Sequence, residues 1–307
     1  MNKKIFSHLL KGGGFLLLAT VLSGCKDMII LNSKGPIGQS ATQLIYISIA
    51  LMLIVVVPVF VMVIWFSVRY REGNKKATYK PDWAHSNAIE WVIWMIPVAI
   101  IAVLAYLTWK STHELDPYKP IASATEPLEV DVISTDWNWV FVYPEDSVAT
   151  VNELVIETGR PVKFRLTSAT VMTSFFIPQL GSQMYAMAGM QTQLNLRADH
   201  SGEYFGRNLE FSGDGYDNMH FKVKAISTGE FHKWVQEAKQ SKLTLSMDKF
   251  NEICVPNMGY PVTVYTTNVP DLLDKVMAPY MDWMNMDGSC GEENCEHECC
   301  KDKNNNN

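Results

Sequence analysis

The sequence predicts a membrane protein in which a hairpin of two transmembrane helices precedes an all-β sandwich with helices at its C-terminal end. Three features indicate this fold class. Two apolar runs, residues 44–68 and 91–109, contain no charged residue and are each close to the length that crosses a bilayer. Apolar and polar residues alternate at several places between 128 and 225, as in half-buried strands, and helical spacing begins near Gly229.

Residues 1–24 have the pattern of a signal peptide. Lys3 and Lys4 form a positive start, an apolar stretch follows from 15 to 22, and the segment ends in Leu22-Ser23-Gly24-Cys25. This ending resembles the lipobox of bacterial lipoproteins, which implies that Cys25 becomes the lipid-bearing first residue of the mature chain. An ordinary signal sequence with a cysteine present by chance is the alternative.

The distribution of basic residues predicts the topology. Residues 25–43 form an outer linker, 44–68 and 91–111 are the transmembrane helices, and 69–90 form the loop between them. Cytoplasmic loops are enriched in lysine and arginine, so this loop is predicted to be cytoplasmic, which places Cys25 and everything after Thr112 outside. The basic residues of the loop are Arg69, Arg71, Lys75, Lys76 and Lys80.

Glu90 stands at the cytoplasmic mouth of the second span. A carboxylate at that depth must meet water, a partner or a proton route. The residues alone leave two interpretations, a simple interfacial carboxylate or the entrance of a proton pathway.

Residues 112–227 are predicted to form the outer domain, a small sandwich of Greek-key type. We expect Trp137 and Trp139 to pack in its core. Residues 228–286 are expected to be helical, with Phe231, Trp234, Val235 and Ala238 on one face. Residues 287–307 are expected to be disordered; they hold four cysteines among acids, at spacings that match no familiar zinc module, and end in asparagines.

The chain resembles subunit II of haem-copper oxidases. The resemblance lies in the order of lipobox, two spans and β-sandwich, in Asp136-Trp137-Asn138-Trp139 and in the segment 174–221. The resemblance covers the mature chain to about residue 285 and implies a cupredoxin-like sandwich. In the cytochrome c oxidases of this family, the sandwich binds two copper ions through two cysteines, two histidines and a methionine. The positions that match those ligands are Thr173, Asn208, Ser212, Tyr216 and Met219.

Only the methionine is kept, and no cysteine occurs between Lys26 and Ile253. Copper of this kind requires thiolate ligands, so we predict that this domain binds no metal. His200 and His220 with one methionine would make at best an improvised site.

Two segments resemble those of subunit II in the quinol oxidases of the cytochrome bo type. They are the segment 212–221 and His85-Ser86-Asn87, which leads to Glu90. That resemblance implies a terminal respiratory complex that oxidises ubiquinol, reduces O2 to water and pumps protons. This chain would bind no cofactor of its own, since haem and copper reside in the large catalytic subunit. It also implies that Glu90 is the entrance of a proton pathway shared with that subunit.

The expected partners are the large subunit, smaller membrane subunits and membrane lipid, with no cytochrome c and no nucleic acid. The expected location is the bacterial inner membrane, with the C-terminal domain in the periplasm. Two other functions remain open, subunit II of a menaquinol oxidase and a stand-alone envelope lipoprotein whose β-sandwich binds a ligand.

Overall fold

The computed structural model describes residues 28–74, 78 and 82–284. They fall into two compact units, of which the first ends at Ala122 and also takes in Ile177–Ser182 and Asn195–His200, while the second holds the other described residues. The predicted signal peptide, Cys25, the loop lysines 75, 76 and 80 and the cysteine-rich tail lie outside the described residues.

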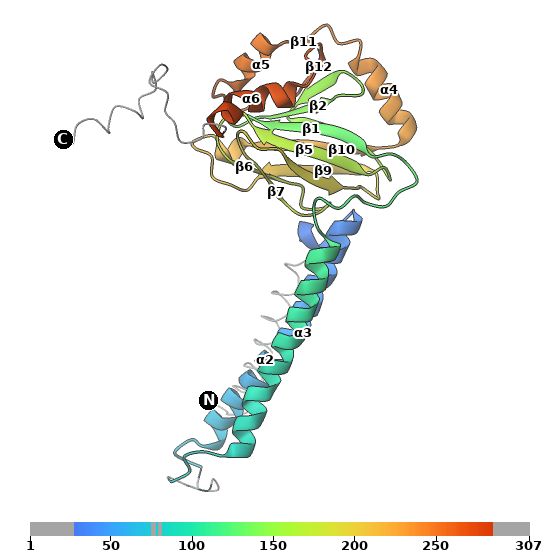
Figure 1. Ribbon diagram of the computed structural model, residues 1–307. Helices are drawn as coiled ribbons and strands as arrows, with labels where there is room; N and C mark the ends of the chain where they lie inside the picture. The colour runs from blue at the N-terminus through green and yellow to red at the C-terminus, as the bar shows by residue number, and fades with distance from the viewer. Residues whose placement is uncertain (1–27, 75–77, 79–81, 285–307) are drawn as a thin grey trace, which may run out of the picture. The chain divides into compact units, whose positions relative to one another are not determined.

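The first unit contains the short 3₁₀ helix η1 (Ile29–Leu31) and two long helices, α2 (Pro36–Arg69) and α3 (Asn87–Glu114) (Figure 1). Both long helices are long and apolar enough to cross a membrane. They contain the predicted apolar runs and extend beyond them at both ends. Pro58 and Pro97 lie inside these helices, as spanning helices tolerate.

The start of α2 packs closely against two segments of its own unit. Lys34 N donates to Gln179 O at 2.7 Å, and Gly38 N donates to Leu180 O at 3.0 Å. A Cβ atom added at Gly35 would lie 2.2 Å from the Arg197 carbonyl oxygen, so only glycine fits there.

The second unit contains the β-sandwich, and the predicted fold class is confirmed. One sheet has seven strands in the order β11-β12-β3-β2-β1-β5-β8, and the other has five in the order β4-β10-β9-β6-β7. The strands are β1 (Leu128–Ser134), β2 (Trp139–Tyr143), β3 (Val148–Val151), β4 (Glu153–Glu157), β5 (Val162–Ser168), β6 (Thr173–Phe176), β7 (Met184–Ala186), β8 (Thr192–Leu196), β9 (Gly202–Asn208), β10 (His220–Ile226), β11 (Thr244–Leu245) and β12 (Thr263–Thr267).

An aromatic cluster fills the space between the sheets. The Trp139 ring lies 5.4 Å from Phe175 and 5.5 Å from Phe221, both edge to face, and these two phenylalanines stack at 5.2 Å. Such pairs add to the large apolar area that each ring buries. The expected core position of Trp139 is confirmed, but Trp137 is only half-buried because it lies on the β1–β2 loop.

Three helices lie in the region after β10 that was expected to be helical: α4 (Thr228–Ala238), α5 (Met247–Cys254) and α6 (Leu272–Met284). The region also contains β11 and β12, which join the edge of the larger sheet. Ser227 and Glu230 form a capping box at the start of α4. Phe231, Val235 and Ala238 of this helix are buried, as its spacing predicts. Helices α5 and α6 supply Phe250, Ile253, Leu272 and Val276 to a second core, which also contains Ile133, Val140 and Val142 of the larger sheet.

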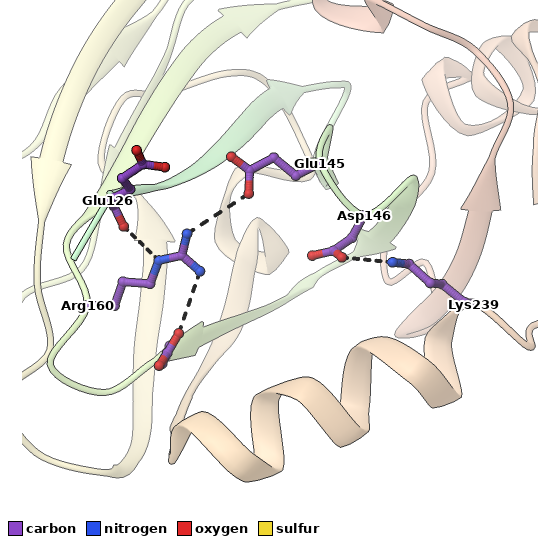
Figure 2. Close-up of polar contacts among 6 residues, drawn as sticks. Glu126, Glu145, Asp146, Arg160 and Lys239 are labelled. Carbon is purple, nitrogen blue, oxygen red and sulfur yellow. Dashed lines mark hydrogen bonds and ion pairs between the residues drawn. The ribbon is translucent and has the colours of Figure 1, made fainter.

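Two ion-pair groups join surface segments of the second unit (Figure 2). Arg160 Nε donates to the Glu126 carbonyl oxygen at 2.9 Å, and its guanidinium lies 4.0 Å from the Glu145 carboxylate. Lys239, at the end of α4, pairs with Asp146 at 2.9 Å. Ion pairs near the surface contribute about 0.2–1 kcal/mol each to stability, so these pairs stabilise the position of the surface segments more than the fold itself.

Candidate functional site

The structure brings the five predicted ligand positions to one end of the sandwich. Thr173 begins β6, and Asn208 ends β9. These two strands are antiparallel, so the start of one lies beside the end of the other. Ser212, Tyr216 and Met219 follow in the loop 209–219, which joins β9 to β10.

Asn208 is the centre of this site and is almost completely buried, with 1% of its surface exposed. Its Oδ1 accepts from Ser174 N at 2.8 Å and from Glu210 N at 2.9 Å. Its Nδ2 donates to Glu210 O at 2.8 Å and lies 3.2 Å from Ser212 Oγ. The amide therefore fixes the start of β6 and the first turn of the loop together.

The thioether of Met219 completes the cluster. Its Sδ lies 3.3 Å from Asn208 Nδ2 and 3.9 Å from Ser212 Oγ, and its carbonyl accepts from Asn208 N at 3.0 Å. Thr173 faces another neighbour, since its Oγ1 donates to Ser134 Oγ at 2.7 Å. Tyr216 joins through the backbone, because its carbonyl accepts from Met219 N at 3.1 Å.

Trp137 contacts the loop 209–219 and is hydrogen-bonded to it. Trp137 has a φ of 71°, in the left-handed region, and its Nε1 donates to the Ser212 carbonyl oxygen at 2.9 Å. A Cβ atom at Gly215 would lie 2.1 Å from the Trp137 ring, so this glycine gives the indole room to lie on the loop. The sequence predicted a core position for Trp137 and gave no indication of this contact, which joins residues 75 positions apart.

The donor atoms of this site do not fit a copper pair. An amide, two hydroxyls and a phenol stand where such copper requires thiolates and imidazoles, and only the thioether of Met219 is retained. Among the described residues, no three His, Cys, Asp or Glu side chains gather where they could hold a metal ion, and this includes His200 and His220.

One cysteine lies in the part of the chain that the structure describes. Cys254, at the end of α5, is a free, half-buried thiol. Burial raises its pKa to about 11, and the negative charge of Asp136 adds to this effect. A thiol with so high a pKa is protonated at neutral pH and is a poor metal ligand.

Glu90 lies in the first turn of α3 and is exposed. Its backbone N donates to Ser86 O at 2.9 Å, which closes the first turn of the helix. The partial positive charge of a helix N-terminus favours a carboxylate at this position.

Known proteins share the sandwich domain of this chain. The family model for the periplasmic domain of cytochrome c oxidase subunit II matches residues 145–226, in agreement with the predicted cupredoxin-like sandwich. The periplasmic domain of subunit II of cytochrome oxidase from Bradyrhizobium japonicum superposes with a TM-score of 0.37 at 21% identity and covers 38% of this chain and 98% of that domain.

Longer relatives match both units. Cytochrome bo(3) ubiquinol oxidase subunit 2 of Pseudomonas aeruginosa is 45% identical over 262 residues, which cover 85% of this chain and 79% of that protein. Quinol oxidase subunit 2 of Bacillus cereus is 37% identical over 243 residues, which cover 78% of this chain and 84% of that protein. The chain therefore belongs to the subunit 2 family of the cytochrome bo(3) ubiquinol and quinol oxidases, within the wider subunit II family of the haem-copper oxidases.

Proposed function

We propose that this chain is the copper-free subunit 2 of a ubiquinol oxidase in the bacterial inner membrane. The complex oxidises quinol, reduces O2 to water and pumps protons. Its large subunit carries the haems and copper, smaller membrane subunits complete it, and neither cytochrome c nor nucleic acid is a partner. The present chain anchors and assembles the complex and holds no redox group.

One observation carries the proposal: at the ligand positions, the buried Asn208 amide is hydrogen-bonded to Ser174 and Glu210 and contacts Ser212 and Met219. A buried amide that already has backbone and side-chain partners loses them if it turns toward an ion. With no thiolate within the described sandwich, electrons from a soluble carrier have no copper to enter through.

Metal analysis of the purified complex tests this directly. Copper and haem iron are measured together, and the near-infrared spectrum is searched for the band of a mixed-valence copper pair. We expect only the copper that the large subunit holds and no such band. Two additional copper ions per complex together with the band would refute the proposal.

Electron-donor kinetics test the choice of substrate. The 45% identity to a ubiquinol oxidase subunit, against 37% to a quinol oxidase subunit, supports ubiquinol. Turnover with ubiquinol, menaquinol and reduced cytochrome c should be highest with ubiquinol and absent with cytochrome c. Preference for menaquinol would select the other quinol, while a chain that purifies without a haem-bearing subunit would favour the stand-alone lipoprotein.

We further infer that Glu90 admits protons from the cytoplasm. Its exposed carboxylate at the start of an apolar helix suits a group that exchanges protons with water. Glu90→Ala should slow turnover while haem spectra and assembly stay normal. Glu72→Ala removes another exposed carboxylate of the same loop and should leave turnover unchanged; equal rates in both variants would remove the assignment.

The same proposal includes a lipid on Cys25 and a periplasmic C-terminal domain. Mass spectrometry of the mature N-terminus should find Cys25 as the first residue, carrying a thioether-bound diacylglycerol. Protease added to spheroplasts should cut the sandwich domain and spare the loop 69–90. An unmodified cysteine or the opposite protection pattern would contradict these points.

A further inference from the structure

An open groove of about 300 Å³ lies beside the first three turns of α2. Leu31 and Ser33, from the segment that precedes the helix, line one side of it. The other side is the helix face formed by Gln39, Thr42, Tyr46 and Ile47. Residues spaced by three, four and seven positions lie on one face of a helix, so this face is continuous.

Hydrogen bonds hold η1 against α2 and so maintain the groove. The Ile30 carbonyl oxygen accepts from Ser33 Oγ at 3.1 Å and from Thr42 Oγ1 at 3.0 Å. The two hydroxyl oxygens also lie 2.7 Å apart. The two hydroxyls and the Ile30 carbonyl at the polar end of the groove are therefore paired, and the described residues that line the groove include no ionised side chain.

The groove changes from polar to apolar along the helix. Gln39 and Thr42 lie at its polar end, whereas Tyr46 and Ile47 lie inside the uncharged run that begins at Leu44. Tyrosine is typical of the membrane-water interface. A molecule with a polar head and a hydrocarbon tail matches this order.

The chain between Cys25 and Met28 is short enough to bring a group attached to Cys25 close to the groove. Cys25 precedes Met28 by three residues, which extend over at most about 10 Å. Met28 is tied to the groove, because its carbonyl accepts from Leu31 N at 3.0 Å. Met28, Ile29 and Ile30 are each 50% exposed, so this end of the unit presents an apolar surface to which a membrane fits.

We propose that an acyl chain of the diacylglycerol on Cys25 lies in this groove, along Tyr46 and Ile47. The inference rests on the proposed lipid attachment and adds a defined seat for the lipid. The lipid then joins the start of the chain to α2, in addition to raising its affinity for the bilayer. Bulk phospholipid and a neighbouring subunit are the competing occupants.

Photo-crosslinking in the intact complex tests the proposal. The probe p-benzoylphenylalanine, which inserts into C–H bonds on illumination, replaces Tyr46, which is 55% exposed in the groove. Ile45, which is 36% exposed and does not line the groove, receives the same probe as the matched control. Trypsin then releases the lipidated dipeptide Cys25-Lys26 and, separately, the helix peptide 35–69.

With the lipid in the groove, peptide 35–69 gains the mass of the lipidated dipeptide. We expect roughly a fivefold excess of this adduct at position 46 over position 45, the ratio that corresponds to about 1 kcal/mol. The adduct should disappear in the Cys25→Ser chain.

Three results would overturn the proposal. Equal yields at the two positions would show that the lipid has no preferred seat. A phospholipid or another subunit captured at position 46 would identify a different occupant. A dipeptide without lipid would remove the lipid attachment itself, while the copper and quinol measurements would still decide the oxidase function.

Discussion

Replacement of Asn208 by alanine tests whether a hydrogen-bonded amide holds the site in place of a metal. The variant removes the acceptor of Ser174 N and Glu210 N and the donor to Glu210 O. It keeps the backbone of β9, including the bond from Asn208 N to Met219 O. The effect should therefore be local to the start of β6 and the loop 209–219.

The magnitude follows from the burial of each group. Ser174 is fully buried, so its orphaned N–H costs about 1–3 kcal/mol. Glu210 is half-buried and can turn to water, so its loss adds on the order of 1 kcal/mol. The sum of about 2–4 kcal/mol predicts local hydrogen exchange that is roughly thirty- to a thousandfold faster.

Hydrogen-exchange mass spectrometry on the purified complex measures this effect at the peptide that contains Ser174. Asn251→Ala is the matched control, because Asn251 is an exposed asparagine of α5 and its loss should change nothing. Exchange at Ser174 that stays within about threefold of the parent chain would show that the amide contributes less than about 1 kcal/mol. The account of the site would then be wrong.

Three further predictions concern the same domain. Gly215→Ala places a Cβ atom 2.1 Å from the Trp137 indole ring and should destabilise the domain by about 1–3 kcal/mol. Gly229→Ala is the control, because the space around Gly229 is open, and it should be neutral or slightly stabilising. Denaturant unfolding measures both effects. Arg165→Leu leaves the Asp131 carboxylate buried without its partner, so it should cost about 3–5 kcal/mol at pH 7. Because burial already raises the pKa of Asp131 and would raise it further in the variant, this deficit should shrink as the pH falls and the carboxyl binds a proton; a deficit that grows in acid would contradict it. Cys254, with its pKa of about 11, should react with iodoacetamide at pH 8 on the order of a hundredfold slower than an ordinary cysteine, and rapid alkylation of its peptide would contradict the burial.

The strands that sequence reasoning found are those with one dominant signal. Strands β1 and β10 alternate apolar and polar residues, and β5 does so over Val162–Leu166, so their period is visible. Strand β3 shows no such period, because all four of its residues are buried. Strand β12 was missed because it lies between two helices of a region read as helical.

For the two long helices, the sequence predicted the membrane-spanning part but not where each helix begins and ends. An uncharged run marks the part of a helix that hydrocarbon can cover, so the predicted spans 44–68 and 91–111 were placed on the uncharged runs 44–68 and 91–109. The helices themselves begin at Pro36 and Asn87, because backbone hydrogen bonding continues through polar residues such as Gln39 and Gln43. Helix length and span length are therefore different quantities.

For the site, the residues could be named but their connections could not. The ligand positions came from the resemblance to a known family, and the structure gathers them at one end of the sandwich. The bond from Ser174 to Asn208 joins residues 34 positions apart, and that from Trp137 to Ser212 joins residues 75 apart. Only the register of β6 with β9 and the course of the loop bring such groups together.

The arrangement explains how a sandwich of this family can fold without copper. The aromatic cluster of Trp139, Phe175 and Phe221 lies between the sheets and holds them together by buried area. The Asn208 cluster lies at the end of the same strands and needs only to keep one loop in place. A metal at that end would organise the loop but not the core, so hydrogen bonds worth a few kcal/mol are enough to replace its structural part. The amide cannot supply electron transfer, which the proposed function assigns to another subunit.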